Sequence, residues 1–294
     1  MKKTLLKIFL IGLIILSFYG VFSITSKKSL PPVFPPKIAE SFRFASLADT
    51  KMGIKTLANL SSQIATISPQ PAFALYEGDL QGKGFDEKSI DFWKNAMGSL
   101  WQKTYFVRGN HDTELQNSDS NWRQFFHQNL DYSFNYKNVH FVGLDCPGDN
   151  VLITADQTKW LDDDLTKAEA IGNKTSFLFF HGPIYFVDDH PSLPNMNLIE
   201  VINKHPSVKA IFNGHEHLLA HTSLDATRIP QLTRTVDQFI TGAAGAETYE
   251  CKPNRSDFCV SSPGFAIVNV EENNYSVAFY VENKIDPVSF ETYY

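Results

Sequence analysis

Hydrophobic residues are arranged in two patterns along this chain of 294 residues. Short apolar runs, typical of buried strands, cover residues 42–48, 72–78, 104–109, 176–181 and 208–214. Elsewhere apolar residues recur every three or four positions, which predicts helices over 54–67, 90–100, 156–170 and 198–203. Strands that alternate with helices in this way are typical of an α/β domain whose strands share a sheet.

Other apolar segments follow one another without a helix between them. Segment 131–145 predicts two strands joined by a turn at Lys137 and Asn138. Near the end of the chain, strands are predicted over 237–243, 264–271 and 275–282, with a turn at Asn273 and Asn274 before the last. We therefore expect two packed mixed sheets with helices outside, in one domain over residues 40–294.

The first 26 residues have the pattern of an export signal. A start that contains Lys2 and Lys3 precedes an apolar run from Ile8 to Ile24, and this run is also long enough for a short membrane span. Residues 1–26 are therefore predicted to be either a cleaved signal peptide or a retained N-terminal membrane anchor. Residues 27–39, which contain a proline-rich stretch, are predicted to be a stiff linker. The domain is expected outside the cytoplasm, with membrane association if the anchor is retained.

Composition narrows the class of protein. A hydrophobic fraction of 43% is enough for a large buried core. The formal net charge is −6 and no dense stripe of lysine and arginine occurs, which argues against a nucleic-acid partner. Cys251 and Cys259 flank a polar loop and either form a disulfide or remain two thiols, while Cys146 is expected to be a buried thiol.

Polar residues with metal-binding side chains follow the predicted strands almost directly. Because strand ends are where chains turn, such side chains can converge on one cleft. The five clusters are Asp49 in LADTKMG, Asp79 in EGDLQG, Asn110 with His111 in RGNHD, His181 in FFHGPIY, and His215 with His217 in NGHEH.

Each cluster alone has an ordinary explanation, since an Asp after a strand is often a helix cap and Gly-Asp is often a turn. The ordered set is more specific. Two histidines in a His-x-His turn lie near each other, and together with Asp and Asn side chains they supply the mixed nitrogen and oxygen ligands of a metal site. Imidazole ligands favour Zn, Mn or Fe over Ca.

The ordered motifs GD, GNHD, HGP and GHEH resemble those of the calcineurin-like metallophosphoesterase superfamily, which includes the purple acid phosphatases. The resemblance spans roughly Phe42 to His221. It implies a four-layer αββα sandwich with a dinuclear metal centre at the strand ends. It also implies hydrolysis of a phosphomonoester or phosphodiester by hydroxide that the metals activate, with a small phosphorylated molecule as substrate.

The resemblance also implies a role for each matching residue. Asp79 would bridge both metals, and Asn110, His181 and His215 would complete the ligands of the second metal. Asp49 and His217 would hold the first metal. His111 would face the phosphate and protonate the leaving oxygen, a task that suits imidazole because its ordinary pKa lies near neutrality.

One position departs from the family pattern. Many relatives read Asp-x-His in the first motif, whereas this chain has Lys51 at the third position, and Gly82 stands where an Asp often follows the second motif. An ammonium about 4 Å from a dication costs on the order of 8 kcal/mol at an effective dielectric constant of 20. Lys51 therefore turns outward to pair with an acid or with the substrate phosphate, loses its proton, or replaces the first metal. The last alternative leaves one metal and favours a non-catalytic domain that binds a phosphorylated ligand.

The remaining candidates have plainer interpretations. Arg108 is expected to form a surface ion pair in preference to a phosphate contact. Segment 241–249, TGAAGAETY, either brings backbone amides to the site or allows tight packing. The other histidines are expected to be surface or packed residues, with His190 nearest to the predicted cleft; they are at positions 127, 140, 190, 205 and 221.

Overall fold

The computed structural model describes residues 41–82, 89–114, 118–126, 129–189, 194–272 and 274–293. The predicted leader (1–26) and linker (27–39) lie outside the described residues, as do His127, His190 and Asn273, so the division of the chain into these segments stays a prediction. Within the described residues, no helix is both long and apolar enough to cross a membrane.

The first sheet has six strands in the order β13-β12-β11-β1-β2-β3. Strands β1, β2 and β3 run parallel, and β11, β12 and β13 are added antiparallel beside β1. The strands are β1 (Phe42–Leu47), β2 (Phe73–Glu77), β3 (Thr104–Val107), β11 (Gly264–Glu271), β12 (Asn274–Val281) and β13 (Ser289–Tyr293).

The second sheet has seven strands in the order β10-β8-β9-β7-β6-β5-β4. Its central strands β5, β6, β7 and β9 are parallel, while β4, β8 and β10 pair antiparallel at the two edges. The strands are β4 (Tyr132–Tyr136), β5 (Val139–Leu144), β6 (Thr175–Phe180), β7 (Val208–Asn213), β8 (Leu219–Leu224), β9 (Val236–Thr241) and β10 (Phe258–Val260).

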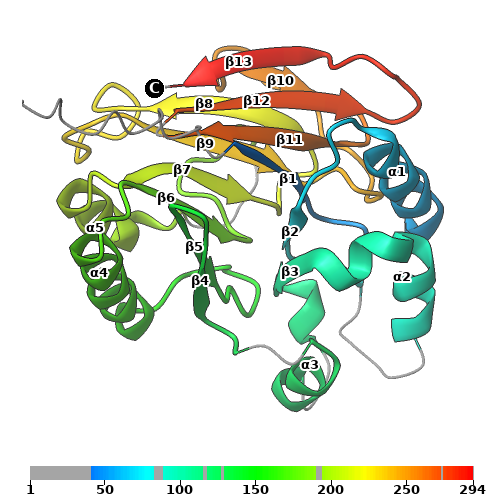
Figure 1. Ribbon diagram of the computed structural model, residues 1–294, viewed down its shortest axis with the longest axis horizontal. Coiled ribbons are helices and arrows are strands. Elements are labelled where there is room, and N and C mark those ends of the chain that lie inside the picture. Colours follow the sequence, from blue (N-terminus) through cyan, green and yellow to red (C-terminus); the bar gives the residue numbers. More distant parts are fainter. Residues whose placement is uncertain are drawn as a thin grey trace, which may run out of the picture. The chain divides into compact units, whose positions relative to one another are not determined.

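Helices cover the outer face of each sheet (Figure 1). Helices α1 (Ile54–Thr66) and α2 (Ile90–Met97) pack on the first sheet, and α4 (Ala155–Ala170) and α5 (Ile199–Lys204) pack on the second. A further helix, α3 (Ser118–Phe126), follows the end of β3. Helix α4 begins with a capping box in which Thr154 and Gln157 bond each other's backbone N–H groups.

Three buried apolar layers hold these elements together. Phenylalanines such as Phe44, Phe141 and Phe212 fill the space between the two sheets. Leu57 belongs to the layer between the first sheet and its helices, and Leu161 to the layer between the second sheet and its helices. Three apolar layers separate four structural layers, so the predicted αββα sandwich of two mixed sheets is confirmed.

The sequence pattern missed several short elements. Strands β8, β10 and β13 and helix α3 were not predicted, because three to nine residues of mixed polarity give a weak periodic signal. The predicted helix 90–100 is α2 followed by a 3₁₀ helix, Gly98–Lys103.

The structure decides between the two alternatives for Cys251 and Cys259. Cys251 and Cys259 form a disulfide that closes the loop before β10, and Cys146 is a buried thiol. The chain therefore carries a covalent cross-link, which is typical of proteins in oxidising compartments.

Candidate metal centre

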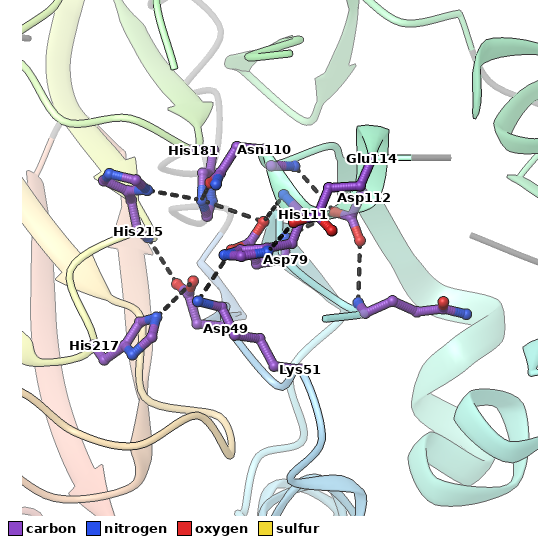
Figure 2. A network of polar contacts seen from close by, with 12 residues as sticks. Asp49, Lys51, Asp79, Asn110, His111, Asp112, Glu114, His181, His215 and His217 are labelled. Carbon is purple, nitrogen blue, oxygen red and sulfur yellow. Dashed lines mark hydrogen bonds and ion pairs between the residues drawn. The ribbon is translucent and has the colours of Figure 1, made fainter. Parts of the chain in front are cut away.

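The predicted ligands all leave the carboxyl ends of parallel strands. Asp49 follows β1 and Asp79 follows β2 in the first sheet, while His181 follows β6 in the second. Asn110 follows β3, and both His215 and His217 follow β7. Figure 2 shows these six side chains as one group, to which the two sheets contribute from opposite sides. The structure therefore brings together residues that are up to 168 positions apart in the sequence.

One half of the group surrounds His181. Its Nε2 atom lies 3.5 Å from Asp79 Oδ1 and 3.2 Å from Asn110 Oδ1. His215 Nδ1 lies 3.2 Å from the same nitrogen (Figure 2). Nitrogen and oxygen atoms this close together are suited to share one cation. These four residues are the predicted ligands of the second metal.

The other half contains Asp49 and His217. His217 Nε2 lies 3.5 Å from Asp49 Oδ1. Ligand atoms of Asp49, Asp79 and His181 lie within 4.8 Å of one another, so the two halves form one continuous group. All of these side chains are buried.

Three buried atoms in this group make no hydrogen bond among the described residues: Asp49 Oδ1, Asp79 Oδ2 and His217 Nε2. Each carboxylate already uses its other oxygen, because the His215 N–H donates to Asp49 Oδ2 at 2.7 Å and the His111 N–H donates to Asp79 Oδ1 at 3.0 Å. Buried polar atoms are costly unless they find a partner. A bound cation would give such atoms a partner, so the residues fit a metal.

The tautomers of two histidines also fit metal binding. His181 Nδ1 donates to the Glu77 carbonyl at 2.7 Å, and His217 Nδ1 donates to the Glu247 carbonyl at 2.7 Å. With the proton on Nδ1, the lone pair of the neutral ring is on Nε2, which points into the group in both cases. Such backbone acceptors are common behind metal-binding histidines.

The backbone at the ligands is in an uncommon conformation. Asp49, Asp79 and His215 have φ values of 60°, 55° and 72°, in the left-handed region. Non-glycine residues rarely adopt this region, and they tend to do so at functional sites. Neighbouring glycines allow the close approach: a Cβ on Gly109 would lie 2.2 Å from Asp79 Oδ1. The glycine in the GNHD motif is therefore required by packing against the Asp79 carboxylate.

Opposite charges shift the pKa values of the buried ligands. Burial opposes ionisation of Asp79, but His181, His111 and Lys51 hold the pKa of this carboxyl well below its usual range. Burial likewise opposes the charge of His181, but Asp79 and Asp49 raise the pKa of His181 to about 9. The carboxylates thus favour positive charge at this position, as a cation site requires.

A carboxylate behind the site connects two of the loops. Asp112 Oδ2 accepts the N–H groups of Asp79 at 2.8 Å and Gly109 at 3.0 Å, and its Oδ1 accepts the N–H of Gln81 at 3.1 Å. Burial, with the nearby Asp79 charge, raises the pKa of Asp112 to about 7, which the amide donors oppose. Sequence reasoning missed this role, because the pattern does not show which amides will surround the last residue of GNHD.

His111, the predicted acid, is partly exposed. Its side chain is 30% exposed, and its Nε2 lies 3.9 Å from Asp79 Oδ2. Its Nδ1 lies 2.5 Å from Glu114 Oε1, which fixes the ring by a charge-assisted hydrogen bond. Glu114 was not singled out in the sequence, although its spacing of three residues after His111 in a short turn is compatible with this contact.

The two basic residues near the site differ from expectation. Lys51 does pair with an acid, but it does not turn outward, as that alternative proposed: its Nζ lies 3.7 Å from Oδ2 of the predicted ligand Asp79. Arg108 does form ion pairs, yet it is buried and not on the surface, so that part of the prediction is wrong. Its guanidinium binds both oxygens of Asp145, at 2.7 and 2.5 Å, and one oxygen of Asp119 at 2.5 Å.

Two further segments frame the site. In segment 241–249, Gly245 packs directly against Gly53, as the tight-packing alternative proposed, and the N–H of Ala246 donates to the backbone carbonyl of Asp49 at 2.8 Å and not to its side chain. Tyr249 stacks on His217 with ring centroids 4.3 Å apart. Glu216, between the histidines of GHEH, accepts the N–H groups of residues 187 and 188 and thereby holds the loop after β6. The roles of Tyr249 and Glu216 were not predicted.

Three of the other histidines are packed residues, as expected. They are buried and bonded to carboxylates: His140 to Asp164, His205 to Asp162 and Glu169, and His221 to Asp237. None of these bonds involves a predicted ligand. His127 and His190 lie outside the described residues.

A two-sheet αββα sandwich with clustered Asp, Asn and His side chains at its strand ends is the arrangement that the resemblance to metallophosphoesterases led us to expect. The family described as calcineurin-like phosphoesterase matches residues 42–219. This chain belongs to that family and is a metal-dependent phosphoric ester hydrolase.

Two curated relatives are named as phosphodiesterases. The probable cyclic nucleotide phosphodiesterase of Ruthia magnifica subsp. Calyptogena magnifica is 28% identical over 200 residues, covering 64% of this chain and 80% of the relative. The 3',5'-cyclic-nucleotide phosphodiesterase of a Nostoc species is 25% identical over 198 residues, covering 63% of this chain and 72% of the relative.

The fold is also similar to that of solved structures. A purple acid phosphatase from yellow lupin (Lupinus luteus) seeds superposes with a TM-score of 0.70 at 13% identity. The match covers 88% of this chain, which spans 54% of that protein. At this identity the likeness concerns the fold.

Proposed function

We propose that this chain hydrolyses a phosphodiester bond in a small nucleotide, of the 3',5'-cyclic nucleotide class. The proposal rests on one observation. Asp49, Asp79 and His181 bring their ligand atoms close together in the protein interior, where Asp49 Oδ1 and Asp79 Oδ2 have no hydrogen-bond partner among the described residues. The names of the two curated relatives support a cyclic diester as substrate.

The metal ligands divide into two sets that share Asp79. Asn110, His181 and His215 would hold one cation with Asp79 Oδ1, and Asp49 and His217 would hold the other with Asp79 Oδ2. When bound, such a pair of cations lowers the pKa of water and offsets negative charge on the phosphoryl group. The protein itself supplies the fixed ligand positions and two sheets that hold them.

His111 acts as the proton donor to the leaving oxygen. Glu114 receives the Nδ1 proton in a hydrogen bond, so the ring turns its Nε2 toward the site. A protonated Nε2 can pass its proton to the oxygen that leaves phosphorus when the ester bond breaks. The His111 side chain is 30% exposed and can therefore be reached by a substrate from solvent, whereas Asp49, Asp79 and His181 are buried.

A second function has one observation in its favour. Lys51 places a positive charge 3.7 Å from Asp79 Oδ2, beside the ligands of one metal position. A chain that kept only one cation would bind a phosphorylated ligand without turning it over. This candidate predicts affinity for nucleotides and no product.

The test uses the purified full chain, loaded with Mn²⁺, against 3',5'-cyclic AMP, bis-p-nitrophenyl phosphate and p-nitrophenyl phosphate. We expect turnover of both diesters, and a His111→Ala variant that retains its Mn²⁺ while losing roughly 10²–10⁴-fold in kcat. Turnover of the monoester alone would contradict the substrate class. Bound Mn²⁺ with no turnover of any of the three esters would favour the binding function.

We further propose that the domain works outside the cytoplasm. The apolar run at residues 8–24 supports export, and the Cys251–Cys259 disulfide fits an oxidising compartment. Fractionation of cells expressing the full chain, with N-terminal sequencing of the product, tests this location and decides between a cleaved signal and an anchor. Recovery of the uncleaved chain in the cytoplasm would contradict it.

A further inference from the structure

Lys51 lies beside the predicted metal ligands but cannot itself bind a metal ion. Its Nζ lies 3.7 Å from Asp79 Oδ2, and the Lys51 side chain is 22% exposed whereas Asp79 is buried. Figure 2 shows Lys51 reaching into the same group of side chains as Asp49 and Asp79. An ammonium has three hydrogen-bond donors and no acceptor, so it cannot bind a cation.

The two oxygens of Asp79 have different surroundings. Oδ1 faces His181 and Asn110 and accepts the His111 N–H at 3.0 Å. Oδ2 faces Lys51 and makes no hydrogen bond among the described residues. A cation held by Oδ2 is therefore a neighbour of the ammonium, whereas a cation held by Oδ1 is bound by the opposite side of the carboxylate.

The metal position beside Lys51 also has fewer protein ligands than the other position. The position on the Oδ1 side has Asn110, His181 and His215 in addition to Asp79. The position on the Oδ2 side has only Asp49 and His217 in addition to Asp79 among the described side chains. Fewer ligands and a like charge both weaken cation binding.

We propose that Lys51 makes the two metal positions unequal. The position formed by Asp79, Asn110, His181 and His215 fills first, and the position formed by Asp49, Asp79 and His217 holds its cation weakly. This inference rests on the metal site of the proposed function, and it adds that the metal content of the protein depends on the available metal concentration.

The experiment titrates the EDTA-treated full chain with Mn²⁺ by calorimetry and counts bound ions by elemental analysis, without substrate. For the unmodified chain we expect two dissociation constants that differ by about tenfold or more. Lys51→Met should tighten binding at the weaker position, lowering its dissociation constant by about tenfold or more, and leave the dissociation constant of the tighter position unchanged. Lys51→Arg, which keeps the charge, should leave both constants as they are.

The matched control is Lys55→Met, which removes the same charge from an exposed position four residues away on α1. It should leave both constants unchanged. Circular dichroism verifies that each variant is folded. If Lys51→Met does not fold, Lys51→Gln provides a second neutral side chain.

Two results would overturn the inference: equal dissociation constants in the unmodified chain, or a weaker constant that neither neutral substitution improves. Because no substrate is present, the result is independent of turnover. A chain with unequal metal binding and no hydrolysis would refute the proposed function and leave this inference standing.

Discussion

Asp112 Oδ2 accepts the backbone N–H of Asp79 at 2.8 Å, so the loop after β3 fixes the carboxylate at the end of β2. The same oxygen accepts the N–H of Gly109, and the other oxygen accepts that of Gln81. A single side chain that binds no cation itself therefore sets the relative position of two ligand loops.

Replacing Asp112 by Ala should weaken metal binding without removing a ligand. Three buried amides lose their acceptor, which costs roughly 1–3 kcal/mol for each group left without a partner. Because supports of this kind typically affect metal affinity by about 10–100-fold, we expect a loss of that size for Mn²⁺. Calorimetric titration measures it, with Asp163→Ala on the exposed face of α4 as the control. An unchanged Mn²⁺ affinity in Asp112→Ala would show that the loops hold their positions independently.

Gly109→Ala should damage the site through a single added methyl group. A Cβ at this position would meet Asp79 Oδ1 at 2.2 Å and the His181 ring at 2.7 Å, so both ligands must move. Gly82→Ala is the matched control, because its Cβ would meet only Lys51 and Met52 atoms, at 3.6 Å or more. We expect Gly109→Ala to lose Mn²⁺ binding and turnover while Gly82→Ala retains both. Full metal occupancy in Gly109→Ala would mean that the close packing seen here has no part in the site.

Arg108→Met should destabilise the whole domain. Arg108 is 2% exposed, and its removal leaves Asp145 as a buried carboxylate without its guanidinium partner. Breaking a buried ion pair in this way costs roughly 3–5 kcal/mol. Urea unfolding followed by circular dichroism measures the change, with the exposed Arg123→Met as the control. If both variants unfold at the same urea concentration, the Arg108 ion pair contributes nothing to stability.

The contact between α4 and α5 should stabilise the domain in a pH-dependent way. Hydrogen bonds from Lys204, which has the larger effect, and from His205 hold the pKa of Asp162 below its ordinary value of 3.8. A carboxyl with a lowered pKa contributes stability above the ordinary value and loses that contribution as pH falls through its own folded-state pKa.

Lys204→Met should therefore lower the melting temperature at pH 6, and the difference from the unmodified chain should shrink as pH falls below 3.8. Lys167→Met, an exposed change on α4, serves as the control. A difference that persists undiminished at low pH would assign the effect to packing of the Lys204 side chain and not to its charge.

The gathering of the strand-end Asp, Asn and His residues could be predicted from the sequence because each one closely follows an apolar strand. Parallel strands bring their carboxyl ends to one edge, so Asp49 and Asp79 were expected together before any distance was known. The same reasoning applied to His181 and His215 in the second sheet. The layered architecture followed because the strands and helices were long enough to show their period.

Residues that support the ligands could not be predicted in this way. Asp112 and Glu216 act through backbone amides of other loops, and Glu114 acts through a side chain within a short turn. Those contacts depend on loop conformation, which neither period nor spacing encodes. Arg108 was expected on the surface because arginine is mostly exposed, and its burial follows from two carboxylates that a linear pattern does not bring together.

The most direct test of the central claim is anomalous diffraction from crystals of the protein soaked in Mn²⁺. We predict an anomalous peak within bonding distance of Asp79 Oδ1 and His181 Nε2, with a weaker peak beside Asp49 and His217. Mn²⁺ located elsewhere on the protein, with these side chains left without a peak, would contradict the account.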